Sequence, residues 1–125
     1  MKVLIVQSCT QLGMLWKNHL TRQGMEVFLA PGQSQAIKVL IQHSPEIIVL
    51  DLMLDQGSAF AVSDFANYRC PEAQVIFVTN TSFFSDGSIF SHSSNACAFI
   101  QSETPPEDLA LLIEHFGTRG SQTPA

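Results

Sequence analysis

The feature that most constrains the fold is a continuous apolar run that ends in a carboxylate, Ile47–Asp51 (IIVLD). Successive apolar, mostly β-branched residues predict a strand buried on both faces, as in a parallel sheet. In an open α/β sheet, ligands bind just outside the carboxyl ends of such strands. Asp51 is therefore placed where chemistry is expected, and what it can do depends on the residues that neighbouring strands place beside it.

Composition sets the class of protein. The chain has 125 residues, of which 46% are hydrophobic and 14% charged, which predicts one domain with a substantial core. A net charge of −5 argues against a nucleic-acid surface, and no apolar run reaches transmembrane length. The cysteines, Cys9, Cys70 and Cys97, lack C-x-x-C spacing and predict reduced thiols. We expect a small cytoplasmic domain without a nucleic-acid or membrane partner.

Strand and helix patterns alternate along the chain, which predicts right-handed crossovers and a parallel sheet covered on both faces. Strands are expected at residues 3–6, 26–30, 47–51, 74–79 and, more weakly, 96–101. Helices are expected at residues 12–22, 34–43, 58–68 and 105–116. The predicted architecture is a five-stranded α/β sandwich.

The helical segments carry apolar stripes that we expect to be buried. In the first, the stripe is Leu12, Leu15, Trp16, His19 and Leu20, with Trp16 in the core and Gly24 after the helix end. In the second, it is Ala36, Ile37, Leu40 and Ile41. In the last, it is Leu109, Leu112, Ile113 and Phe116.

The last helix has a capping-box pattern. Thr104 is the expected N-cap, proline occupies the first helical position, and Glu107 occupies the third. Gly117 is expected to end the helix. The domain would therefore span residues 1–117, and residues 118–125 would form a flexible tail.

The segment between the last two strands is unusual. Residues 81–95 contain six serines and few helix formers, so any fourth helix there should be short or distorted. We expect its aromatic residues, Phe83, Phe84 and Phe90, to be held under the loop rather than displayed to a partner.

Nearly the whole chain resembles a response-regulator receiver domain of two-component signalling. Asp51 matches the phosphoacceptor, Thr79 after Val75–Val78 matches the switch hydroxyl, and Phe99 matches the mobile aromatic position. Pro105–Leu109 matches the start of the last helix. The resemblance implies a flavodoxin-like (βα)5 three-layer sandwich with strand order 2-1-3-4-5.

The departures from the receiver pattern bear directly on function. Receivers place two acidic residues after the first strand, where they bind Mg²⁺, and these positions are Gln7 and Ser8 here. Receivers also place a lysine at the end of the fifth strand, and that position is Ser102. Asp51 and Thr79 alone remain of the five residues that carry the chemistry.

A single carboxylate is a poor site for Mg²⁺ or for a phosphoryl group. Asp51 with the main-chain carbonyl of Met53 offers few of the oxygen ligands that Mg²⁺ requires. Asp55 and Glu103 are the residues that could lean in to complete the site, although Asp55 is more simply an exposed turn residue. We therefore expect no firm metal site, weak Mg²⁺ binding at most, no other cofactor and no enzymatic activity beyond slow phosphoryl acceptance.

Other features of the sequence favour ordinary roles. The turn Gln7–Gly13 slightly resembles a phosphate-binding loop, but Ser8 and Thr10 are more simply helix caps. Cys9 has no basic neighbour in sequence and is expected to be buried and inert. The histidines show no metal-ligand spacing.

The function predicted from the sequence is that of a stand-alone, atypical receiver that signals mainly by binding a protein. The alternative is a working phosphoacceptor at Asp51 in a phosphorelay. The expected partner is a histidine kinase or a downstream effector, which would bind the face formed by residues 81–95, the fifth strand and the last helix. A homodimer through the same face is also open.

Overall fold

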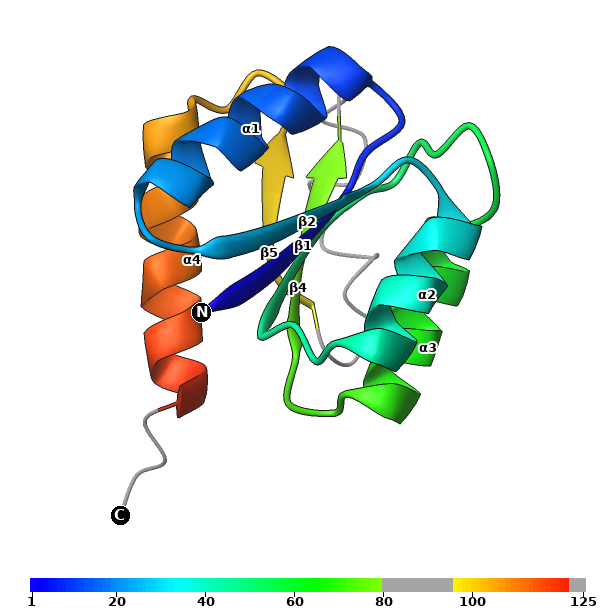
Figure 1. Cartoon of the computed structure of the whole chain (residues 1–125). Helices are drawn as coiled ribbons and strands as arrows, with labels where there is room; N and C mark the ends of the chain where they lie inside the picture. Colours follow the sequence, from blue (N-terminus) through cyan, green and yellow to red (C-terminus); the bar gives the residue numbers. More distant parts are fainter. Residues whose placement is uncertain (80–95, 122–125) are drawn as a thin grey trace.

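A computed structural model describes residues 1–79 and 96–121 of the chain. Five strands form one parallel sheet of order β2-β1-β3-β4-β5, which confirms the flavodoxin-like α/β fold (Figure 1). The strands are β1 (Lys2–Val6), β2 (Glu26–Ala30), β3 (Ile47–Asp51), β4 (Gln74–Thr79) and β5 (Ala96–Gln101). The helices are α1 (Thr10–Arg22), α2 (Gln33–Gln42), α3 (Ala59–Arg69) and α4 (Pro106–Ser121).

Two apolar cores lie on the two faces of the sheet. Helices α1 and α4 cover one face, and α2 and α3 cover the other (Figure 1). Alternate residues of β3 divide between the faces: Ile47 and Val49 join the α1/α4 core, whereas Ile48 and Leu50 join the α2/α3 core. Because all four side chains are fully buried, the prediction of a strand covered on both sides is confirmed.

The register of the sheet brings the strand ends together at one edge. Val6 of β1 pairs with Leu50, Asp51 pairs with Val78, and Thr79 pairs with Gln101. The loops that follow β1, β3 and β5 therefore open at the same edge, which is where ligands bind in folds of this kind.

Two residues predicted to be buried are exposed. Leu15 of α1 is 53% exposed and Ile41 of α2 is 52% exposed. In α1 the buried residues are Gly13, Trp16 and Leu20, because Gly13 lies so close to β2 that a Cβ atom there would come within 2.7 Å of a Leu29 methyl group. This close approach turns Leu15 away from the sheet. Ile41 lies in the last turn of α2, beyond the buried Leu40.

The last helix differs from its prediction at both ends. It begins at Pro106, and the carbonyl of Pro105 accepts hydrogen bonds from the N–H groups of Asp108 and Leu109, so the N-cap is Pro105 and not Thr104. It continues through Gly117 to Ser121. A glycine within a helix costs about 1 kcal/mol, which is not enough by itself to end it.

Several predictions fall outside the described residues. The segment 81–95, with Phe83, Phe84 and Phe90, is among them, and so are residues 122–125. Across residues 1–79 and 96–121, no helix is both long and apolar enough to cross a membrane.

Candidate functional site

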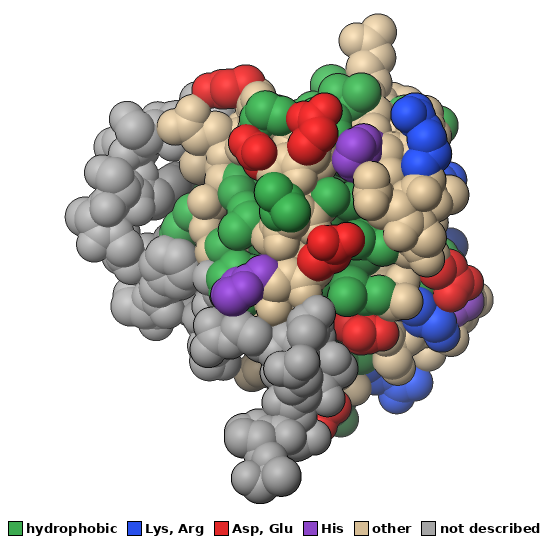
Figure 2. Space-filling view, turned by 90° about the vertical axis from the view of Figure 1, so that its left-hand side faces the viewer, with side chains coloured by type: hydrophobic (Ala, Val, Ile, Leu, Met, Phe, Trp, Pro, Cys, Tyr) green, Lys and Arg blue, Asp and Glu red, His purple; other side chains and the backbone are tan. Residues whose placement is uncertain are grey.

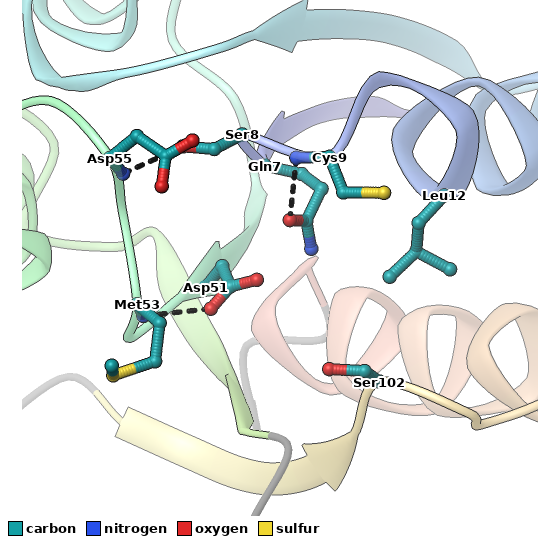
Figure 3. A pocket seen from close by; sticks show the side chains of 8 residues that line it. All are labelled: Gln7, Ser8, Cys9, Leu12, Asp51, Met53, Asp55 and Ser102. Atoms are coloured by element: carbon teal, nitrogen blue, oxygen red, sulfur yellow. Dashed lines mark hydrogen bonds between the residues drawn. The ribbon is translucent and has the colours of Figure 1, made fainter.

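Asp51 lies at the carboxyl end of β3 and borders a pocket. The side chain is only 8% exposed. The pocket has a volume of about 350 Å³ (Figure 3). It is lined by Gln7, Ser8, Cys9, Leu12, Asp51, Met53, Asp55 and Ser102. The structure thus brings together four positions singled out from the sequence, namely the phosphoacceptor position and the three positions where receivers carry charged residues.

Burial dominates the electrostatics of Asp51. Removal from water raises the pKa of its carboxyl group above the ordinary value, because burial disfavours the ionised form. The Met53 N–H, which donates to Oδ1 at 2.8 Å, lowers the pKa. The Gln7 amide lies near the carboxylate and lowers the pKa less, although its geometry does not make a hydrogen bond, and the Asp55 carboxylate raises the pKa further. The polar groups around Asp51 therefore compensate only partly for its desolvation.

Gln7 presents a donor to the pocket. Its Oε1 accepts a hydrogen bond from the Cys9 N–H at 3.0 Å, which fixes the orientation of the amide. Its Nε2 points into the space between Asp51 and Ser102 (Figure 3) and, among the described residues, has no hydrogen-bond partner. Gln7 is 3% exposed, so this nitrogen is a buried donor facing the pocket.

Ser8 links two loops instead of capping α1. Its hydroxyl donates to the Pro31 carbonyl at 3.0 Å and accepts from the Asp55 N–H at 2.9 Å (Figure 3). The N-cap of α1 is Cys9, which makes no side-chain capping bond, and Thr10 is the first helical residue. The prediction that Ser8 and Thr10 cap this helix is therefore wrong, because the serine hydroxyl has partners in the loops after β2 and β3.

The lysine position of receivers is occupied by a neutral hydroxyl. Ser102 follows β5, lines the pocket and donates its N–H to the Thr79 carbonyl at 3.0 Å. Thr79 is 6% exposed and is not among the residues that line the pocket. Phe99 is half-buried, and its ring packs against that of Phe77 at a centroid distance of 5.7 Å. The switch roles of Thr79 and Phe99 stay predictions.

The donors around the pocket are a poor match for Mg²⁺, which favours several oxygen ligands. Asp55 does border the pocket, whereas Glu103 is exposed and does not line it. Within the described part of the chain, no group of three or more His, Cys, Asp or Glu side chains could hold a metal ion. The nearest residue that replaces a receiver acid, Gln7, directs an N–H donor toward the pocket, and this dipole disfavours a cation.

Cys9 was expected to be buried, and it is exposed at the pocket rim. Its position after a buried strand and before a helix start explains the difference, since the backbone there lies at the edge of the sheet. Cys70 is buried between α3 and β4, as an inert cysteine would be. Cys9 was expected beside the site, whereas the role of Leu12 as a pocket wall was missed from sequence, although Leu12 lies in the first turn of α1.

Comparison with solved structures identifies the fold more closely. A CheY-like response-regulator receiver domain protein from Methanospirillum hungatei matches with a TM-score of 0.87 at 22% identity, over 97% of this chain and 96% of that one. The chain has the fold of response-regulator receiver domains. Family models and curated protein sequences were also compared, and neither comparison gives a match.

Two further structures share this receiver fold. NtrX from Brucella abortus, in complex with ATP, matches with a TM-score of 0.86 at 20% identity, over 95% of this chain but only 27% of that one. A response regulator from Burkholderia pseudomallei, with a phosphorylated aspartic acid, a calcium ion and citrate, matches with a TM-score of 0.80 at 17% identity. That match covers 94% of this chain and 69% of the other. At these identities the likeness is one of fold.

Proposed function

We propose that this protein is an atypical receiver in two-component signalling that acts mainly by binding a protein partner, and that Mg²⁺-dependent phosphorylation of Asp51 is impaired. One observation carries the proposal: Asp51 lies at the end of β3 in a receiver fold, and the three charged residues of receivers are replaced by neutral side chains that line its pocket. The fold likeness supports the signalling class, and the neutral pocket supports the impairment.

The impairment follows from the charges that phosphoryl transfer requires. The transferred group is anionic and approaches another anion, so a working site needs concentrated positive charge. A cation and a lysine each stabilise the transition state by about 3 kcal/mol, so losing both slows transfer by about 10⁴-fold.

The surface proposed for the partner includes β5 and α4. Exposed acidic residues Glu107, Asp108 and Glu114 surround Leu111, which is 64% exposed, and Figure 2 shows hydrophobic and acidic side chains interspersed on this side of the molecule. Such a surface fits a partner that brings basic side chains around an apolar contact. Two copies facing each other here would place like charges together, so a different protein is favoured over a homodimer.

The test is direct phosphorylation. The protein is incubated with Mg²⁺ and acetyl phosphate and followed by intact mass, beside Asp51→Asn and a receiver that has the full set of charged residues. We expect the full receiver to gain one phosphoryl group within minutes while this protein remains unlabelled. Rapid stoichiometric labelling that disappears in Asp51→Asn would overturn the proposal.

A second candidate is a working phosphoacceptor in a phosphorelay. One observation favours it: Asp51 borders the pocket, so a donor protein can reach its carboxylate. A cognate histidine kinase could supply cationic groups that a small phosphodonor lacks. Transfer of radiolabelled phosphate from that kinase to the wild type but not to Asp51→Asn would establish this function, and no transfer would exclude it.

A further inference from the structure

We propose that the pocket beside Asp51 binds a carboxamide, a neutral group whose oxygen accepts hydrogen bonds and whose nitrogen donates them. The proposal rests on a fixed, unpartnered donor, Nε2 of Gln7, and an acceptor, the Asp51 carboxylate, that lie side by side in the pocket lining (Figure 3). Carboxamide binding in this pocket goes beyond the proposed function, because it does not depend on the binding of a protein partner.

The donor is the amide of Gln7. Because the Cys9 N–H bonds to Oε1, the amide cannot turn over without losing that bond, and Nε2 stays directed into the pocket. The nitrogen is buried and has no hydrogen-bond partner within residues 1–79 and 96–121. A buried donor left unpaired is destabilising, so a ligand acceptor that pairs with it is favoured at this position.

The start of α1 favours a ligand acceptor at the same position. The first helical hydrogen bond runs from the Gly13 N–H to the Cys9 carbonyl, so the preceding N–H groups have no acceptor within the helix. The helix has no side-chain cap and no acidic residue in its first turn. Cys9 and Leu12 bring this end of α1 to the pocket wall, where its partial positive charge favours a ligand oxygen.

The acceptor is the carboxylate of Asp51. Oδ1 is engaged by the Met53 N–H, and the rest of the carboxylate borders the pocket, where it can accept from a ligand N–H. The Ser102 hydroxyl on the opposite wall can donate or accept. A carboxamide matches this order of groups, with its oxygen toward Gln7 and α1 and its nitrogen toward Asp51.

Charge and shape exclude the related alternatives. A carboxylate would be repelled by Asp51 and Asp55, and an ammonium group, although these two residues attract it, has no acceptor for Nε2 of Gln7. The volume of about 350 Å³ and the apolar Leu12 and Met53 leave room for a ring attached to the amide. The ligand class is therefore an aromatic or aliphatic carboxamide.

The experiment compares three probes with one ring and different head groups, namely benzamide, benzoate and benzylammonium. Each is titrated into ¹⁵N-labelled full-length protein, and amide shifts are followed at residues around the pocket. We expect benzamide to give saturable shifts at Cys9, Met53 and Ser102, with a dissociation constant on the order of millimolar. Benzoate should bind at least about five-fold more weakly because its negative charge meets Asp51 and Asp55. Benzylammonium should bind at least about five-fold more weakly because it has no oxygen to accept a hydrogen bond from Nε2 of Gln7.

A pair of variants tests the donor. Gln7→Met keeps a side chain of similar length and removes Nε2, and it should weaken benzamide binding about five-fold. Gln11→Met, at an exposed glutamine outside the pocket lining, should leave binding unchanged. The three probes on the wild-type protein decide the matter even if Gln7→Met does not fold.

Three outcomes would overturn the proposal. They are tighter binding of benzylammonium or Mg²⁺ than of benzamide, tighter binding of benzoate, and no saturable shift at pocket residues with any probe. Tight Mg²⁺ binding would also count against the impaired phosphorylation of Asp51, whereas the other two outcomes would overturn the carboxamide proposal alone, so the failures of the two proposals can be told apart.

Discussion

The hydroxyl of Ser8 gives the most sharply defined stability prediction, because it joins two loops at the pocket. It donates to Pro31 in the loop after β2 and accepts from the N–H of Asp55 in the loop after β3. Ser8→Ala removes both hydrogen bonds and leaves Cβ in place. No other side-chain contact needs to change.

The expected loss follows from the number of bonds and their exposure. A hydrogen bond contributes about 0.5–1.5 kcal/mol net, so two bonds contribute about 1–3 kcal/mol. Ser8 is half-buried and water can reach the partners it leaves behind, which places the loss in the lower part of this range, at about 1–2 kcal/mol. For a domain of this size, Tm should fall by about 3–8 °C.

The acid that receivers carry at this position should be no better tolerated. In Ser8→Asp the carboxylate can still accept from Asp55, but it cannot donate to the Pro31 carbonyl and would place two oxygen atoms against each other. We expect Ser8→Asp to lose at least as much stability as Ser8→Ala. The neutral hydroxyl of Ser8 therefore stabilises the loops after β2 and β3 in a way that an aspartate cannot.

Urea unfolding followed by the fluorescence of Trp16 measures both effects. Trp16 is the single tryptophan and is fully buried, so its emission reports global unfolding. Ser44→Ala, at an exposed loop serine with no side-chain hydrogen bond among the described residues, is the matched control. If Ser8→Ala changes the free energy of unfolding by less than about 0.5 kcal/mol, as the control should, the linking role of Ser8 is refuted.

Three further predictions concern the same fold and pocket. The native state holds the proton of Asp51 more tightly than the unfolded chain does, so stability should fall as pH rises from the ordinary pKa of 3.8 through the raised value. Asp51→Asn should remove that part of the pH dependence in urea titrations between pH 3 and 8, and an unchanged profile would contradict the buried carboxylate. The triple variant Gln7→Asp, Ser8→Asp, Ser102→Lys should gain Mg²⁺ binding by calorimetry and labelling by acetyl phosphate, whereas Ser102→Lys alone should gain little; labelling equal to wild type in the triple variant would show that other residues block the site. Phe77→Ala, in the fully buried middle of β4, should cost about 3–5 kcal/mol in urea unfolding, and a loss under 1 kcal/mol would refute its place in the core.

The fold could be predicted from the sequence because the patterns that indicate strands and helices recur along the whole chain. Apolar runs and helical stripes occur in alternation, and one error of helix face, such as Leu15, leaves the topology unchanged. Strand bounds agree within one residue because a strand buried on both faces begins and ends with its apolar run. The ends of α4 were less predictable, since capping residues and a single glycine change helix free energy by only about 1 kcal/mol.

The pocket could be predicted in part. The resemblance to receivers placed Gln7, Ser8 and Ser102 beside Asp51, and the structure brings them there. Their hydrogen bonds could not be predicted, because those bonds join loops that are distant in sequence. Ser8 bonds to residues 23 and 47 positions away. The orientation of the Gln7 amide could not be predicted from the sequence either. It follows from the hydrogen bond between the Cys9 N–H and Oε1, which leaves Nε2 facing the pocket.

The separation between core and pocket explains how this fold keeps its shape with neutral side chains beside Asp51. The two apolar cores lie on the faces of the sheet, and among the described residues Leu12 is the one that both lines the pocket and packs against either of them. Neutral hydrogen bonds hold the loops there: besides those of Ser8, Gln33 donates its N–H to the Gln56 carbonyl and accepts from the Ser58 N–H through its side chain. Buried charges need counter-charges, whereas these neutral groups satisfy one another. A site held in this way keeps its geometry without a cation, which is consistent with the proposed impairment of phosphoryl transfer, a reaction that requires positive charge at the site.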